Sequence, residues 1–161
     1  MRTVLARNSP RAASWPAALA MLTLAPACSP PDHVTVDHAW VRLSAVRTNP
    51  AAAYFTIHGG PNDETLINVT ADTAVRAEMH ETMKMDRKPG QRMMTMQPVK
   101  AVPLPARADI VFAPGGRHVM LFDINPGIKP GMTMALTFSF SDGSRLTERA
   151  NVIGAGDPAP E

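Results

Sequence analysis

The sequence of 161 residues contains a single cysteine, Cys28. One cysteine cannot form a disulfide within the chain, so the fold must be stable without such a cross-link. No internal repeat and no long helical period are visible either. The length is enough for one domain with a hydrophobic core but short for two. We therefore expect one compact domain that depends on its core.

Acidic residues are absent before Asp32, whereas three arginines lie within the first eleven positions. The arginines precede the apolar run AASWPAALAMLTLAPA, which is too short to span a membrane as a helix and contains Pro16 and Pro26. A basic start followed by a short apolar run is typical of a secretory signal peptide. We expect residues 1–27 to be such a peptide and to be removed.

Cys28 directly follows this run, in a stretch, LAPAC, that resembles the processing box of bacterial lipoproteins. In such proteins the cysteine becomes the lipidated first residue. Ordinary cleavage after Ala25-Pro26-Ala27 is the alternative, and it would leave a soluble protein with a free thiol. Lipidation of Cys28 is favoured because an unpaired exported thiol is otherwise open to oxidation. The expected location is periplasmic, with the lipid as the one membrane contact.

The charge balance changes once the leader is set apart. The whole chain has 16 basic and 14 acidic residues, but three of the basic residues and none of the acidic residues lie in positions 1–27. The remainder has 13 basic and 14 acidic residues, a net charge of −1. A near-neutral domain offers no basic surface for nucleic acid, so we expect no nucleic-acid partner.

Short apolar runs recur from position 39, separated by Gly, Pro, Asn and Asp at intervals of about ten residues. This spacing predicts an all-β protein, a single antiparallel sandwich or barrel of seven to nine strands over residues 38–153. We expect a tether, or a lead-in strand, at 28–37 and a disordered tail at 154–161. The candidate strands are 39–46, 52–58, 65–70, 74–81, 92–98, 109–113, 118–124, 132–140 and 145–152.

Six of the eleven methionines fall between positions 79 and 96, together with many charged residues and the turn sequence KPG. This composition predicts a solvent-facing hairpin. Methionine is an ordinary core filler, and packing is the expected role of Met132 and Met134. An exposed hairpin is a poor place for so many apolar side chains, which leaves a soft-metal site or a partner-binding surface.

The stretch RHVMLFD contains an imidazole and a thioether two residues apart, His118 and Met120. Side chains two apart in a strand point to the same face, roughly 7 Å from each other along the backbone. Val119 and Leu121 would then face the core. Thioether sulfur prefers Cu(I), and imidazole suits copper generally. The pair therefore predicts half of a soft-metal site.

Met96, a gap of 21 residues and then His118-x-Met120, with His80 upstream, resembles the periplasmic copper chaperone family called PCuAC, which supplies Cu(I) to the CuA centre of cytochrome c oxidase. The segments AWVR, AAAYFTI, EMHE, MTMQPV, VPLPA and APGGRHVMLFDI match as well, so that the resemblance covers residues 37–152. It implies a cupredoxin-like fold, a carrier rather than an enzyme, and His80, Met96, His118 and Met120 as Cu(I) ligands.

The hairpin departs from the family pattern. Fifteen residues separate His80 from Met96, where the family has ten. The two share a site only if the hairpin register keeps them on one face. The extra length supplies further candidate ligands, which are Met83, Met85, Met93 and Met94.

The resemblance also implies partners, namely the CuA subunit of cytochrome c oxidase, a thiol-type copper-assembly protein, or both, and a monomeric carrier. Copper sequestration is one alternative. A metal-independent, lipid-anchored β-sandwich interaction module is another.

A blue-copper electron-transfer site is excluded because it needs a cysteine thiolate, and the one cysteine lies at the predicted processing point. No nucleophile elbow, hydrolase motif or phosphate loop is present. His33 and His38 are expected to be surface residues, and His58 a strand-end residue.

Overall fold

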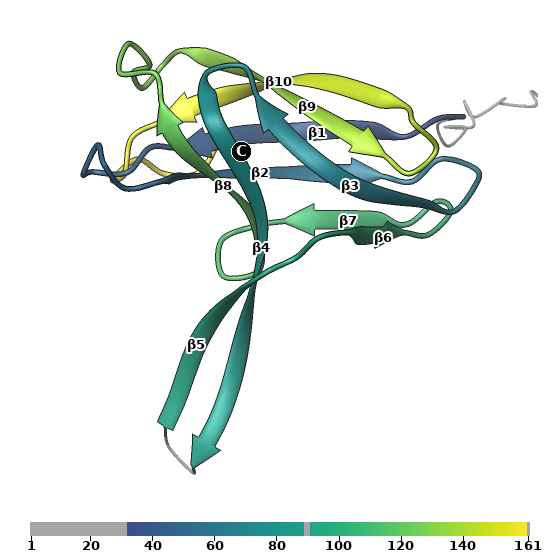
Figure 1. Ribbon diagram of the computed structural model, residues 1–161, viewed down its shortest axis with the longest axis horizontal. Helices are drawn as coiled ribbons and strands as arrows, with labels where there is room; N and C mark the ends of the chain where they lie inside the picture. Colours follow the sequence, from purple (N-terminus) through teal and green to yellow (C-terminus); the bar gives the residue numbers. More distant parts are fainter. Residues whose placement is uncertain (1–31, 89–90, 161) are drawn as a thin grey trace, which may run out of the picture.

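The computed structural model describes residues 32–88 and 91–160, and of residues 84–88 and 91–93 the backbone alone. The predicted signal peptide and Cys28 lie outside the described residues. Ten strands are described (Figure 1): β1 Thr35–Arg42, β2 Ala51–His58, β3 Glu64–Ala71, β4 Ala74–Lys88, β5 Gln91–Pro98, β6 Val102–Leu104, β7 Asp109–Phe112, β8 Arg117–Ile124, β9 Thr133–Phe140 and β10 Arg145–Ile153.

The strands form one curled sheet in the order β5-β4-β8-β7-β2-β1-β10-β9-β3-β6, and β8 also pairs with β2. Most neighbours are antiparallel, whereas β1 with β10 and β7 with β8 are parallel. The all-β prediction is confirmed. The described residues form one strand more than the upper prediction, and the strand that was missed is β6, which is only three residues long with Pro103 at its centre. Proline, which has no backbone N–H, is tolerated in such an edge strand. A run this short with proline at its centre has no periodic pattern that would predict a strand.

Strict alternation builds the core. In β2, residues 51, 53, 55 and 57 are buried, and in β9 the same holds for residues 134, 136, 138 and 140. Phe55 stacks on Phe112 at 4.3 Å between ring centroids and meets the edge of Phe138 at 4.7 Å. Since Phe55 lies in β2 and Phe138 in β9, this aromatic cluster joins two distant parts of the sheet across the core.

A bulge in β1 sets which side chains reach the outer face near the N-terminal end. His38 has a positive φ of 49°, and the pairing of β1 with β2 shifts between Asp37 and Trp40. Because of this extra residue, Val36 and Ala39 both face the core, while Asp37 lies outside it. The strand begins at Thr35, so that residues 35–37 of the expected tether are part of the sheet.

The strands β4 and β5 form a hairpin that extends away from the body of the molecule (Figure 1). The first half of β4 pairs with β8 over residues 74–81, and the second half pairs with β5 over residues 80–88. The predicted hairpin is therefore confirmed, and it starts where β4 leaves the body.

Two smaller expectations meet a different outcome. Met134 is buried as predicted, but Met132 precedes β9 and is 45% exposed, so its predicted packing role is wrong. Within the segment predicted as a disordered tail, the backbone N–H of Gly154 donates to the carboxylate of Asp157 at 2.6 Å and closes a turn.

Within the part of the chain that the structure describes, no helix is both long and apolar enough to cross a membrane.

We predict that Phe138→Ala lowers the free energy of unfolding by about 3–5 kcal/mol, because it leaves a cavity where two parts of the sheet meet. Urea unfolding at constant pH measures the change. Val46→Ala is the control, since Val46 is 54% exposed and its truncation should change stability by less than about 0.5 kcal/mol. Equal losses in the two variants would contradict the assignment of Phe55, Phe112 and Phe138 as the centre of the core.

Candidate metal site

Three neighbouring strands carry the four predicted ligand residues. His80 in β4 lies opposite His118 in β8, and Met120 lies opposite Glu78 two positions along the same pair of strands. Across the hairpin, Met96 in β5 lies opposite Thr82. Directly opposed residues, and residues two apart in one strand, share a face of the sheet. His80, Met96, His118 and Met120 therefore share one face of β5-β4-β8.

The intervening residues occupy the other face. Met79, Val119 and Leu121 are all buried in the core. The prediction that Val119 and Leu121 supply the core while His118 and Met120 face away from it is thus confirmed. Alternate side chains in RHVMLFD therefore pack into the core on one face of the sheet and form the candidate metal site on the other.

The longer hairpin keeps His80 and Met96 on one face. His80 lies opposite Pro98 rather than opposite Met96, an offset of two residues. An offset of two preserves the face, whereas an offset of one would have turned one side chain away. The irregularity in the pairing occurs farther out, between Asp86 and Lys88.

His118 is held in one tautomer by the backbone. Its Nδ1 donates to the carbonyl oxygen of Gly116 at 3.1 Å, so Nε2 of the neutral ring carries the lone pair. The residue is only 7% exposed, and its ring centroid lies 5.9 Å from that of His80. Metal-binding histidines are typically fixed in this way through the nitrogen that does not bind the metal.

In His80 the hydrogen bond is made by the other ring nitrogen, Nε2. Its Nε2 donates to a carboxylate oxygen of Glu78 at 3.2 Å, and the side chain is 14% exposed. Its Nδ1 is buried and has no hydrogen-bond partner among the described residues. An unpaired buried nitrogen costs about 1–3 kcal/mol. A lone pair left in this state beside a second histidine fits a nitrogen that is a metal ligand.

Glu78 is the supporting residue that sequence reasoning missed. Its carboxylate accepts from His80 and also forms an ion pair with Arg76, whose guanidinium lies over the Phe122 ring at 3.7 Å from the centroid. The hydrogen bond from His80, joined by the charge of Arg76, holds the pKa of Glu78 below its ordinary value. The available signal was the spacing of two in EMH, which places both side chains on one face.

The methionines of the hairpin divide between its faces. Met96 is 59% and Met94 62% exposed, and both are on the His80 face, since Met94 lies opposite Lys84. Met83 lies opposite Thr95, on the other face, and is 45% exposed. Of the other two candidate ligands, Met85 and Met93, the side chains lie outside the described residues.

A metal site on this face would need thioether sulfur in addition to the two imidazoles. Over residues 32–88 and 91–160, no group of three or more His, Cys, Asp or Glu side chains is placed to hold a metal ion. Two imidazoles alone are a weak donor set, whereas two imidazoles with Met96 and Met120 form a soft, neutral one. The chemistry of this face therefore favours a monovalent soft ion over a hard divalent one.

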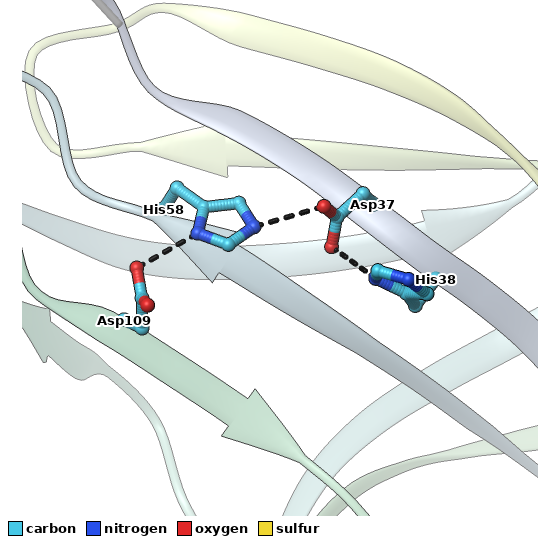
Figure 2. A network of polar contacts seen from close by, with 4 residues as sticks. All are labelled: Asp37, His38, His58 and Asp109. Atoms are coloured by element: carbon cyan, nitrogen blue, oxygen red, sulfur yellow. Dashed lines mark hydrogen bonds and ion pairs between the residues drawn. The ribbon is translucent and has the colours of Figure 1, made fainter. Parts of the chain in front are cut away.

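A separate polar cluster lies at the other end of β2 (Figure 2). The ring of His58 is bonded through Nδ1 to Asp109 in β7 at 2.7 Å and through Nε2 to Asp37 in β1 at 3.0 Å. Asp37 also accepts from His38 at 2.7 Å. Because the two nitrogens of His58 point in opposite directions, they cannot bind one ion together. The cluster instead links three strands.

Ionised carboxylates can only accept, so His58 forms both bonds only in its protonated form. The hydrogen bond to Asp109 raises the pKa of His58 above its ordinary value; desolvation opposes this rise, and the bond to Asp37 adds to it. Burial raises the pKa of Asp37, but the hydrogen bonds and charges of His38 and His58 outweigh burial and hold it below its ordinary value. His58 thus does more than end a strand.

Residues 34–152 match the model of the family described as "Putative lipoprotein LpqE-like". The chain belongs to this family. A curated relative, "Putative lipoprotein Lxx21020" of Leifsonia xyli subsp. xyli (strain CTCB07), is 32% identical over 115 residues, which cover 70% of this chain and 65% of the relative. This chain therefore spans less than two thirds of that protein's length.

Several solved structures share the fold of this chain. The copper-bound PCuAC domain from PmoF2 has a TM-score of 0.59 at 22% identity and covers 78% of this chain and 96% of its own. Apo-DR1885 from Deinococcus radiodurans has a TM-score of 0.56 at 26% identity over 98% of this chain and 100% of that one. CuI-DR1885 has 0.53 at 25% identity, covering 79% and 81%. The resemblance stated from the sequence is confirmed.

We predict that the His58 cluster makes stability depend on pH. The raised pKa of His58 gives stabilisation that is complete below about pH 6.5 and is lost as the pH rises through the folded value. The lowered pKa of Asp37 gives stabilisation that is present above about pH 4 and is lost on acidification. The cluster should therefore stabilise most between these limits.

Thermal unfolding of His58→Gln at pH 5.5 and pH 8.5 tests this prediction. The deficit relative to wild type should be larger at pH 5.5, by at most about 1 kcal/mol, because the cluster is partly exposed. His33→Gln, which removes an exposed histidine outside the cluster, is the control and should run parallel to wild type. A His58→Gln deficit that is equal at the two pH values would contradict the assignment of a charged bridge.

Proposed function

We propose that this protein is an extracytoplasmic Cu(I) carrier that binds the ion through His80, Met96, His118 and Met120. The observation that carries this proposal is the buried Nδ1 of His80, without a hydrogen-bond partner among the described residues, beside His118 on the methionine face. A purely structural histidine pair would be expected to satisfy its buried nitrogens.

The donor set suits transport more than storage. All four donors are neutral when they bind, and two thioethers with two imidazoles match the preference of Cu(I). Thioethers need no deprotonation, so uptake and release through sulfur are independent of pH. Met96 is more than half exposed, which leaves one side of the site open to an acceptor. A closed thiolate cage would bind more tightly and release more slowly.

Hydrogen bonds around the histidines support the same role. Glu78 and the carbonyl of Gly116 each fix one ring, and they do so through different nitrogens, Nε2 of His80 and Nδ1 of His118. Such outer partners orient ligands before the metal arrives and raise their basicity. The two imidazoles are therefore preorganised on the paired strands β4 and β8.

The relatives support copper as the cargo. The PmoF2 domain is described as copper-bound and one DR1885 structure as the Cu(I) form. The description of the LpqE-like family and of the Leifsonia relative as lipoproteins supports an exported protein anchored at Cys28. In this setting the protein acts as a carrier without catalysis.

The acceptor that we propose is the CuA centre of cytochrome c oxidase, reached directly or through a thiol-type copper-assembly protein. A thiolate-rich acceptor binds Cu(I) more tightly than neutral thioethers do, so transfer runs from this site to the acceptor. Copper sequestration, by contrast, requires the ion to remain bound when such an acceptor is offered.

Titration of the purified protein with Cu(I) against a competing chelator should give one tightly bound ion. The double variant His118→Ala with Met120→Ala should bind Cu(I) at least about 100-fold more weakly, since it loses two of four donors. The matched control, His33→Ala with Met132→Ala, removes the same two side-chain types from exposed positions and should keep the wild-type affinity.

Unchanged affinity in the first double variant would refute the site. The loaded protein, mixed with an apo CuA domain, should lose its copper to it. Retention of the ion would instead indicate sequestration, and partner capture that is unaffected by metal removal would indicate an interaction module.

Glu78→Gln should weaken Cu(I) binding by about 10-fold, because the amide holds the imidazole of His80 less firmly and no longer increases its basicity. Glu81→Gln is a close control, since Glu81 lies one residue beyond His80 on the other face and forms an ion pair with Arg117 at 3.3 Å. Competitive Cu(I) titration measures both variants. Equal effects would show that Glu78 acts on the strand as a whole instead of on His80.

A further inference from the structure

The ligand face continues outward along β5 beyond the four residues assigned above. Met94 follows Met96 at a spacing of two, so the two side chains share the face and their backbone positions are roughly 7 Å apart. They are 62% and 59% exposed. Two adjacent, largely exposed thioethers are unusual on a charged ribbon, where such apolar side chains contribute little to packing.

The register gives Met94 a defined place relative to the inner site. Met96 lies opposite Thr82 and diagonally from His80, while Met94 lies opposite Lys84, one step farther along the hairpin. Figure 1 shows that this direction leads away from the body of the molecule. His118, His80, Met96 and Met94 therefore follow one another on one face, first across the strands and then outward along β5.

Met83 provides a natural comparison. It belongs to the same hairpin and is 45% exposed, but it lies opposite Thr95 and thus on the other face. If exposure on the hairpin were the relevant property, Met83 and Met94 would be equivalent. If position on the ligand face is the relevant property, only Met94 extends the site.

We propose that Met94, together with Met96, forms an outer thioether station through which Cu(I) passes between the inner site and its acceptor. This inference rests on the proposed function and adds an exit route to it. The ion remains Cu(I) throughout. One thioether bond to Met94 forms as an imidazole or thioether bond of the inner site breaks, and no proton or electron is transferred.

Stepwise exchange explains why Met96 is exposed although it belongs to the inner set. A ligand shared between the two positions keeps the ion coordinated at every stage, so no step requires a bare ion. The outer station has two neutral sulfurs where the inner site has four donors, so it binds more weakly. It should therefore affect the rate of transfer more than the equilibrium affinity.

The test uses purified protein loaded with one equivalent of Cu(I) and mixed with the chelator bathocuproine disulfonate, whose colour reports transfer. Met94→Leu should slow transfer about fivefold, equivalent to about 1 kcal/mol in the barrier, with an unchanged equilibrium affinity. Met83→Leu should transfer at the wild-type rate. Leucine preserves the apolar volume in both variants and removes only the sulfur.

A second measurement does not depend on the chelator. With Ag(I) as a redox-inert substitute for Cu(I), a second equivalent should shift the methyl resonances of Met94 and Met96 in NMR spectra and leave that of Met83 in place. No shift at Met94, or equal shifts at Met94 and Met83, would overturn the outer station.

The outcomes separate the two proposals. If Met94→Leu and Met83→Leu transfer at the same rate while the inner site still binds one Cu(I), the outer station is wrong and the carrier function stands. If the wild-type protein takes up no Cu(I), the carrier function fails and the outer station fails with it.

Discussion

The pairing of β4 with β8 is the constraint on which the candidate site depends. It places His80 opposite His118, and with them Glu78 opposite Met120. The same pairing sends Met79 and Val119 into the core. A shift of either strand by one residue would turn its imidazole into the core and its core side chain outward, so the hydrophobic effect that stabilises the fold also fixes the face of the candidate metal site. Site and stability are thus set by one register.

Alternation of apolar side chains made most of the fold predictable. β2 and β9 read directly from their sequences because every second residue is buried. β6 was not predictable, since three residues around Pro103 carry no periodic signal. Nor was the bulge at His38, because an extra residue with a positive φ leaves the composition of β1 unchanged. The LpqE-like membership and the PCuAC fold agree with the motif, whose residues are spread along the chain.

The residues of the candidate site could be predicted from the sequence, but the hydrogen bonds that hold their side chains in place could not. Spacing alone placed His118 and Met120 on one face, whereas the relation of His80 to Met96 required the hairpin register. The role of Glu78 and the carbonyl of Gly116 could not be deduced from residue type, because hydrogen-bond partners depend on three-dimensional proximity. The bridge from His58 to Asp37 and Asp109 was missed for the same reason, since His58 and Asp109 are 51 positions apart in the sequence.

The hairpin begins where β4 leaves the body. As a result, the candidate donors on the body are held more rigidly than the one on the hairpin. His80 and His118 stand on strands paired within the body, with their rings already held in place. Met96 stands on the edge strand β5, which pairs only with β4 among the described strands. Most of the ordering entropy of binding therefore falls on one unbranched side chain. In the carrier that we propose, a donor set built in this way accommodates the changing coordination of an ion in transit while its two nitrogen donors stay still.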